Sequence, residues 1–387
     1  MKSPIFVGTL LCACVLGFRP SPSTSNLFRR GLPTLKSNQC EDESRRSFID
    51  VARKLPLLGV LCSSPALATG IISSDSSMPV WTLDGGVKMP TLALNTAGLT
   101  TEGTARALRL AIDSGITHVD FHPGIERDGV AKVLRSGAER SSLFLTTKIR
   151  KAAPGTAPEA AAAAVRAQIA QDLDALGVER VDLLMLRDSP DCAAMRAQWA
   201  VLEDARRAGK TRAIGVVNFC QSALECLLDG AGNGAAAVKP AVNYFMLHAG
   251  MGPDAHGLRT FGESRGVRTF AYGALGEPGP SAELLSSPAV RQAAAAHGGK
   301  SPEEVAMRWV LQSGAALSVR PSRNFGLAGS LCEAGVSCRT SISSRAKIFD
   351  WELTEMEMAA LDALKSPDGN PTLFSSSGCP GAFVFPM

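Results

Sequence analysis

The chain lacks an uninterrupted apolar run of the roughly 18 residues that a membrane span requires. It also lacks a strong charge of either sign, because its 387 residues carry a net charge of only +4. Nine Lys/Arg and four Asp/Glu lie in residues 1–68, which leaves 31 basic and 32 acidic residues for the remainder. This balance argues against nucleic-acid binding through phosphate charge.

Zinc-site spacing is also absent: the ten cysteines and five histidines form no Cys-x-x-Cys pair and no Cys/His cluster. We therefore expect no metal site, and buried or free thiols for the cysteines beyond residue 68. Cys332 and Cys338 are close enough in sequence for a disulfide in an oxidising compartment, which is the alternative for that pair. The six cysteines concerned are Cys192, Cys220, Cys226, Cys332, Cys338 and Cys379.

No Gly-x-Gly-x-x-Gly motif follows an early strand, so the sequence predicts no Rossmann dinucleotide-binding domain. The glycine-rich residues 230–234 come after a helical pattern, as in a flexible loop, and do not open a helix. The apolar share of 45% and the charged share of 20% are typical of a globular domain with a sizeable core.

The first residues of the chain have the composition of targeting segments. Residues 4–17 form a short apolar run behind Lys2, as in a secretory signal peptide. Residues 18–40 contain Ser, Pro, Asn and Arg but no acidic residue, which is typical of an organelle transit segment.

A third signal follows at Ser44-Arg45-Arg46-Ser47, which resembles a twin-arginine export motif. An apolar stretch at 55–62 and the small-residue cleavage site Ala66-Leu67-Ala68 come after it in the usual order. Together the three signals resemble the targeting of a protein of the thylakoid lumen in a complex plastid. We expect residues 1–68 to be removed; the alternative is a disordered tail with an amphipathic helix at 44–60.

From residue 80 onward, short apolar runs alternate with longer helical patterns. Residues 81–90 predict a β-hairpin with a glycine turn. Strands that alternate with helices predict parallel pairing, and eight such units over about 280 residues predict an α/β fold, a (β/α)₈ TIM barrel. An open doubly wound sheet is the main alternative. The expected strands are 91–94, 117–121, 143–148, 181–186, 213–217, 241–245, 267–272 and 316–319, and the expected helices are 102–115, 126–137, 157–176, 193–208, 221–229, 255–265 and 303–312.

In such a barrel, functional side chains lie at the C-terminal ends of the strands. Asp120 and Lys148 end neighbouring strands, so an ion pair between them would fix both side chains and tune a third group nearby. A lone Asp in this position is more often a helix cap. The strand-end residues are Thr96, Asp120, Lys148, Arg187, Asn218, Tyr244, Tyr272 and Arg320.

Several of these segments resemble, in order, motifs of the aldo-keto reductase family. Asp120 and Lys148 match the catalytic aspartate and lysine of that family, and residues 181–186 match the strand that ends in its catalytic histidine. The resemblance extends over residues 80–365 and leaves 366–387 as a C-terminal tail. The remaining similar segments are the hairpin at 82–90, Gly215-Val216-Val217-Asn218-Phe219, 239–243, 270–276, the helix after Ser301-Pro302 and the closing motif at 349–353.

The resemblance implies a nicotinamide cofactor, NADP(H), bound without a Rossmann fold. Asn218 would bind the carboxamide and Tyr272 would stack on the nicotinamide ring. Guanidinium groups suit a phosphate dianion, so arginines after the last strand would hold the 2′-phosphate; a solvated loop is the alternative there. The residues so implied to bind the cofactor are Thr96, Asn218, Tyr272, Gly273, Leu275, Gly276, Arg320, Ser322 and Arg323.

The sequence departs from the family pattern where the proton is donated. Ile125 stands in place of the catalytic tyrosine and Arg187 in place of the histidine. Isoleucine cannot act as a general acid, a role worth about 10²–10⁴-fold in rate. Arginine keeps its proton, so Arg187 is expected to orient a carbonyl or bind an acidic substrate. Ala97 stands in place of the family's substrate-pocket Trp, and Tyr244 in place of a Gln. Residues 326–345 look like an insertion relative to the family. The residues that could donate the proton instead of the missing tyrosine are His122, Tyr244, His248 and Lys148.

Three functions follow from this pattern. The first is an NADP(H)-dependent reductase of a small aldehyde or ketone, with altered or weak activity. The second is a non-catalytic barrel that binds the cofactor as a redox sensor or assembly partner, and the third is a structural barrel without cofactor. Asp120, Lys148 and Asn218 favour cofactor binding, whereas Ile125 and Arg187 favour weak turnover.

Overall fold

The computed structural model describes residues 78–189, 191–228, 236–254, 257–276, 281–321, 332 and 336–364. The expected targeting segments, the C-terminal tail at 366–387, and the predicted phosphate ligands Ser322 and Arg323 lie outside these residues.

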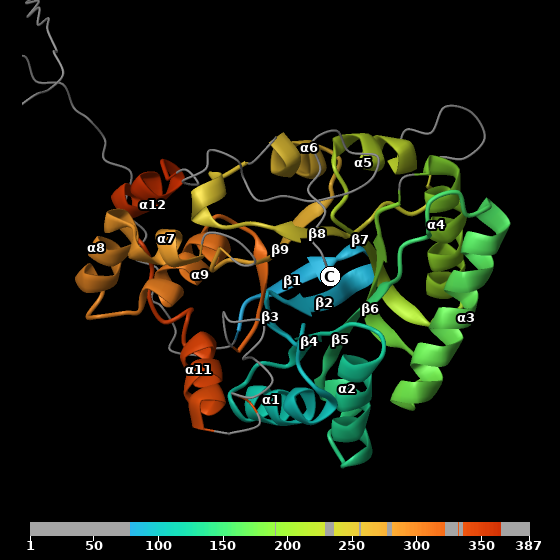
Figure 1. Cartoon of the computed structure of the whole chain (residues 1–387), viewed down its shortest axis with the longest axis horizontal. Helices are drawn as coiled ribbons and strands as arrows, with labels where there is room; N and C mark the ends of the chain where they lie inside the picture. The colour runs from blue at the N-terminus through green and yellow to red at the C-terminus, as the bar shows by residue number, and fades with distance from the viewer. Residues whose placement is uncertain are drawn as a thin grey trace, which may run out of the picture. The chain divides into compact units, whose positions relative to one another are not determined.

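The predicted N-terminal hairpin is confirmed. Strands β1 (Val80–Leu83) and β2 (Val87–Pro90) pair antiparallel. Gly85 and Gly86 connect them with φ of 77° and 74°, a left-handed backbone that glycine adopts without steric cost. The hairpin buries Val87 and Met89 in one cluster with residues of the barrel interior, so it covers one end of the barrel (Figure 1).

Eight parallel strands form a closed barrel in the order β10-β3-β4-β5-β6-β7-β8-β9. The last strand pairs with both β9 and β3, which closes the sheet and excludes the open doubly wound alternative. The predicted (β/α)₈ fold is therefore confirmed. The strands are β3 (Leu92–Asn95), β4 (His118–Asp120), β5 (Phe144–Ile149), β6 (Val181–Arg187), β7 (Thr211–Val217), β8 (Val242–Met246), β9 (Arg268–Tyr272) and β10 (Ala316–Val319).

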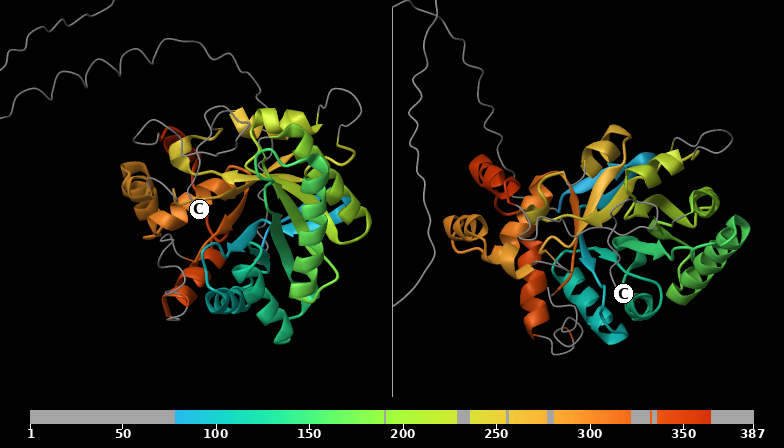
Figure 2. Two further views of the ribbon diagram at one scale, coloured as in Figure 1. Left: turned by 45° about the vertical axis from the view of Figure 1, so that its right-hand side comes forward. Right: turned by 45° about the horizontal axis from the view of Figure 1, so that its top comes forward.

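Helices surround the strands on the outside of the barrel (Figures 1 and 2). All seven expected helices are present, and α9 begins with the capping box that Ser301 and Glu304 form. Among the described residues, four further α-helices were not predicted, and one of them, α11, overlaps the expected insertion. None of the described helices is long and apolar enough to span a membrane. The helices are α1 (Thr101–Asp113), α2 (Ile125–Arg135), α3 (Pro158–Leu176), α4 (Cys192–Arg207), α5 (Gln221–Leu228), α6 (Leu258–Ser264), α7 (Ser281–Ser286), α8 (Pro288–Ala296), α9 (Pro302–Gln312), α11 (Val336–Ala346) and α12 (Glu355–Asp362).

Strand alternation divides the core into two layers, as β6 shows. Leu183 and Met185 pack in the barrel interior, whereas Leu184 and Leu186 pack between the strands and the helices. The outer helices approach one another closely at Gly129 of α2. A Cβ atom there would lie only 2.5 Å from Cβ of Thr104 in α1, so this contact requires glycine.

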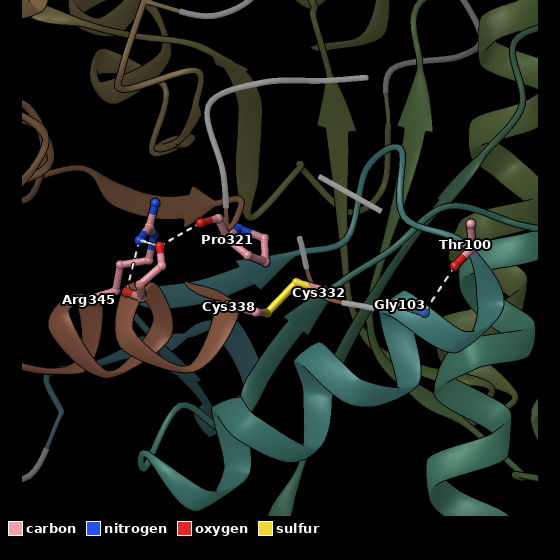
Figure 3. Close-up of a disulfide and its surroundings, with 7 residues drawn as sticks. Thr100, Gly103, Pro321, Cys332, Cys338 and Arg345 are labelled. Atoms are coloured by element: carbon pink, nitrogen blue, oxygen red, sulfur yellow. Dashed lines mark hydrogen bonds between the residues drawn. A yellow bond between two sulfur atoms is a disulfide. The ribbon is translucent and has the colours of Figure 1, made fainter. Parts of the chain in front are cut away.

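Two disulfides between described residues overturn the expectation of free thiols for four cysteines, and Cys220 is disulfide-bonded as well. Cys192 at the start of α4 is bonded to Cys226 in α5, with a Cα–Cα distance of 5.9 Å. Cys332 is bonded to Cys338 in α11, near the start of α1 (Figure 3). The first pair is separated by 34 residues, and the packing of α4 against α5 brings its sulfurs together. Sequence spacing could not reveal that contact.

Candidate active site

Asp120 and Lys148 form a buried ion pair in the barrel interior. They lie near the ends of the neighbouring strands β4 and β5, and Lys148 Nζ contacts Asp120 Oδ1. Both side chains are fully buried. The structure thus brings the two together as expected, while their roles in catalysis stay a prediction.

The second carboxylate oxygen of Asp120 is held by side chains from other strands of the barrel. Tyr244 Oη and Ser318 Oγ each donate to Asp120 Oδ2 at 2.7 Å, and Asn95 Nδ2 donates to Tyr244 Oη at 3.0 Å. Strands β3, β8 and β10 therefore all contribute to fixing one carboxylate. Sequence reasoning missed Asn95 and Ser318, whose only signal is an inward-facing position on a strand.

Burial sets the ionisation of the two groups beside Asp120. Burial lowers the pKa of Lys148, although the charge of Asp120 acts in the opposite direction. Burial and then the negative charge of Asp120 hold the pKa of Tyr244 well above its usual value. The Tyr244 ring lies 5.0 Å from Lys148 Nζ, where its π face can stabilise the ammonium.

A second cluster of polar side chains connects the residues that follow β4 with the end of β6. His122 Nδ1 and Glu126 Oε2 are 2.9 Å apart, and Arg187 Nη2 lies 3.3 Å from His122 Nε2. A guanidinium can only donate, so Nε2 accepts and Nδ1 carries the proton that it donates to Glu126. Burial, followed by the charge of Lys148, lowers the pKa of His122, which favours this neutral form.

Glu126 was not predicted, and it connects three segments of the site. Burial acts to raise its pKa, but the hydrogen bonds that Glu126 accepts from His122 and the charge of Lys148 outweigh it and lower the pKa to about 2. Thr96 Oγ1 also donates to Glu126 Oε2 at 2.9 Å. The Thr96 hydroxyl thus has a protein partner, and its predicted role with the cofactor stays a prediction.

Tyr272 and Asn218 form a unit at the ends of β9 and β7. Tyr272 Oη donates to Asn218 Oδ1 at 3.0 Å, and Asn218 has a left-handed φ of 57°. Burial raises the pKa of Tyr272 to about 12. Gly273 and Gly276 follow with φ of 68° and 77°, and a backbone hydrogen bond of 2.9 Å closes the turn between them.

Residues 89–366 match the family model described as the aldo/keto reductase family. The chain belongs to the aldo-keto reductase family. It is 30% identical over 320 residues to NADPH-dependent codeinone reductase 1-4 of Papaver somniferum, a match over 75% of this chain and 90% of that protein. It is also 30% identical over 311 residues to an aldo-keto reductase of Mycobacterium sp. strain KMS, a match over 78% of this chain and 99% of the relative.

Solved structures agree in fold with this aldo-keto reductase. The crystal structure of an aldo/keto reductase from Brucella melitensis superposes with a TM-score of 0.60 at 24% identity. The match covers 74% of this chain and 98% of that one. At this identity the likeness shows the shared fold alone.

In this aldo-keto reductase, neither Ile125 at the tyrosine position nor the expected substitute donor His248 can act as an acid. Ile125, the first residue of α2, is 64% exposed and carries no donor group. His248 is fully buried after β8, its two ring nitrogens have no hydrogen-bond partner among the described residues, and burial lowers its pKa to about 4. His248 is therefore neutral at physiological pH.

The predicted phosphate ligands are only partly described. Arg320 follows β10 directly and is buried, while Ser322 and Arg323 lie outside the described residues. Leu275 is buried in the turn after β9. The cofactor roles of all four residues stay predictions.

Proposed function

We propose that this aldo-keto reductase reduces a small aldehyde or ketone with NADP(H), with weak or altered activity. The observation that carries the proposal is the buried ion pair of Asp120 and Lys148. Tyr244 donates a hydrogen bond to Asp120, and the centroid of its ring lies 4.9 Å from that of Tyr272. The Lys148 ammonium lies 5.0 Å from the ring of Tyr244, and the neighbouring Tyr272 with Asn218 would hold the nicotinamide. The relative from Papaver somniferum is itself named as NADPH-dependent.

The residues present fit a nicotinamide cofactor. The amide oxygen of Asn218 is occupied by Tyr272, whereas its Nδ2 donates to no other described residue and is available to a carboxamide oxygen. Gly273 and Gly276 leave backbone without side chains next to Tyr272, where Leu275 completes the turn and a pyrophosphate can approach. Arg320, Ser322 and Arg323 would hold the 2′-phosphate, and Thr96 would complete the site.

The positive groups of the site would favour negative charge on a carbonyl oxygen. When bound, the reduced nicotinamide supplies the hydride. Lys148 is fixed by Asp120, and Arg187 is held against His122, so both cations are oriented before substrate arrives. Preorganised charges of this kind stabilise developing oxyanions. The isoleucine at position 125 removes the usual general acid, which accounts for the weak turnover proposed here.

The test is to titrate the purified protein with NADPH by fluorescence and then measure aldehyde-dependent NADPH oxidation. Lys148→Met should lower kcat by about 10²-fold or more, because it removes the oriented charge. Lys132→Met is the matched control, since its exposed ion pair with Glu102 lies on the helical surface and such pairs contribute little.

The outcomes separate the three functions. Binding with turnover that depends on Lys148 supports the reductase. Binding without turnover against a panel of aldehydes and ketones would instead support a cofactor-binding barrel. A protein that neither binds NADPH nor oxidises it would be a structural barrel.

We further propose that the protein acts in the thylakoid lumen of a plastid after removal of residues 1–68. The order of the three N-terminal signals supports this proposal. The disulfides Cys192–Cys226 and Cys332–Cys338 are consistent with an oxidising compartment. The expected mature protein begins near residue 69.

A further inference from the structure

Asp188 is a buried carboxyl group at the mouth of the barrel. It directly follows Arg187, the last residue of β6, and its backbone N–H donates to Val217 O at 3.2 Å. That bond places it beside the end of β7, where Asn218 comes next along the chain. Asp188 is only 4% exposed.

Within the described part of the chain, one of the two oxygens of the Asp188 carboxyl group lacks a hydrogen bond that would stabilise the ionised form. Its Oδ2 is buried and has no hydrogen-bond partner among the described residues. Burial therefore dominates and raises the pKa of Asp188 to about 7, although the charges of Lys151 and Arg187 act to lower it. Burial raises the pKa of the Tyr272 phenol to about 12, and an electrostatic interaction with Asp188 acts in the same direction.

The other acidic protons of the site are committed elsewhere. Tyr244 Oη donates to Asp120, and the Lys148 ammonium is paired with the same carboxylate. His122 is neutral and accepts from Arg187 at Nε2. An efficient general acid has a pKa near the working pH, which leaves a protonated carboxyl as the suitable group.

We propose that Asp188 donates the proton in carbonyl reduction, in place of the tyrosine that the family has at the position of Ile125. The inference rests on the proposed function. The carbonyl carbon gains a hydride from the reduced nicotinamide, and the carbonyl π electrons move to the oxygen. That oxygen takes the proton of the Asp188 carboxyl group and becomes the alcohol hydroxyl. Asp188 is left as a carboxylate, and a proton from solvent restores it.

The first test compares Asp188→Asn with wild type in NADPH-dependent reduction of an electron-poor benzaldehyde. The wild-type kcat should fall as pH rises through about 7, because the carboxyl group loses its proton. Asp188→Asn should lower kcat by about 10²-fold or more and abolish this pH dependence, with NADPH affinity unchanged. Asp191→Asn is the matched control: Asp191 caps α4 by accepting from Ala194 N at 3.0 Å, a role that asparagine performs equally well.

The second readout does not depend on activity. Infrared difference spectroscopy of the cofactor-free protein should show a protonated carboxyl band that titrates near pH 7 in wild type and in Asp191→Asn. The band should be missing in Asp188→Asn. If Asp188→Asn does not fold, Asp188→Glu replaces it and should retain the pH dependence of kcat at a reduced value.

Distinct outcomes overturn the inference and the proposed function. If wild type reduces the aldehyde and Asp188→Asn keeps both its kcat and its pH profile, Asp188 is not the donor and only the inference fails. The inference also fails if the infrared band is absent from wild type. If wild type binds NADPH but reduces no carbonyl, the proposed function fails and the inference fails with it.

Discussion

Two aspartates at the same end of this barrel differ in what surrounds them. Asp120 contacts the Lys148 ammonium and accepts hydrogen bonds from Tyr244 and Ser318. Asp188 is also buried, but its Oδ2 has no such partner among the described residues. The surroundings of a carboxyl group can therefore decide its chemical role. Hydrogen-bond donors and cations favour its charged form, whereas burial without them favours its neutral form.

The raised pKa of Asp188 should be visible in protein stability. The pKa of Asp188 is raised from its ordinary value of 3.8 to about 7 in the folded state, so between these two pH values the folded state binds one more proton than the unfolded state. Stability from this group is therefore present below about pH 4 and is lost as pH rises through about 7. Relative to wild type, Asp188→Asn should gain up to about 4 kcal/mol in unfolding free energy between these limits, measured by urea denaturation. A constant difference across this pH range would show that Asp188 ionises normally.

At the scale of elements, helices α4 and α5 are joined both by packing and by a covalent bond. Cys192 and Cys226 close a loop of 34 residues that contains the whole of β7. Asn218 lies in this loop, so the disulfide constrains the segment that would meet the nicotinamide. Cys332 and Cys338 close a loop of only 6 residues.

Removing these two disulfides should destabilise the protein to different extents. The double variant Cys192→Ala/Cys226→Ala should lose about 3–4 kcal/mol of unfolding free energy, because the longer loop restricts the unfolded chain more. Cys332→Ala/Cys338→Ala should lose about 2 kcal/mol. Urea denaturation of both variants measures the difference. Equal losses would show that loop length does not control the effect in this protein.

At the scale of the whole molecule, the recognisable family resemblance and the N-terminal signals lie in separate parts of the chain. The family match begins at residue 89, and the predicted targeting signals lie in residues 1–68. A targeting segment acts before folding and need not contribute to the barrel core.

The mass of the protein isolated from its source tests the proposed maturation. Cleavage after Ala66-Leu67-Ala68 predicts a mature protein that begins at residue 69, because the peptidase requires small side chains there. A purified full-length chain provides the reference mass. A native protein that retains residues 1–68 would contradict both the cleavage and the proposed lumenal location.

The sequence by itself determined the barrel and the Asp120–Lys148 pair. Alternating strand and helix patterns specify parallel strands, and the ends of neighbouring parallel strands must meet at one end of a sheet. Only the tertiary structure decided the hydrogen bonds of Tyr244 and Glu126, the Cys192–Cys226 bond and the environment of Asp188. These features depend on distances and burial between residues far apart in the chain, and a pattern read along one chain carries no measure of either.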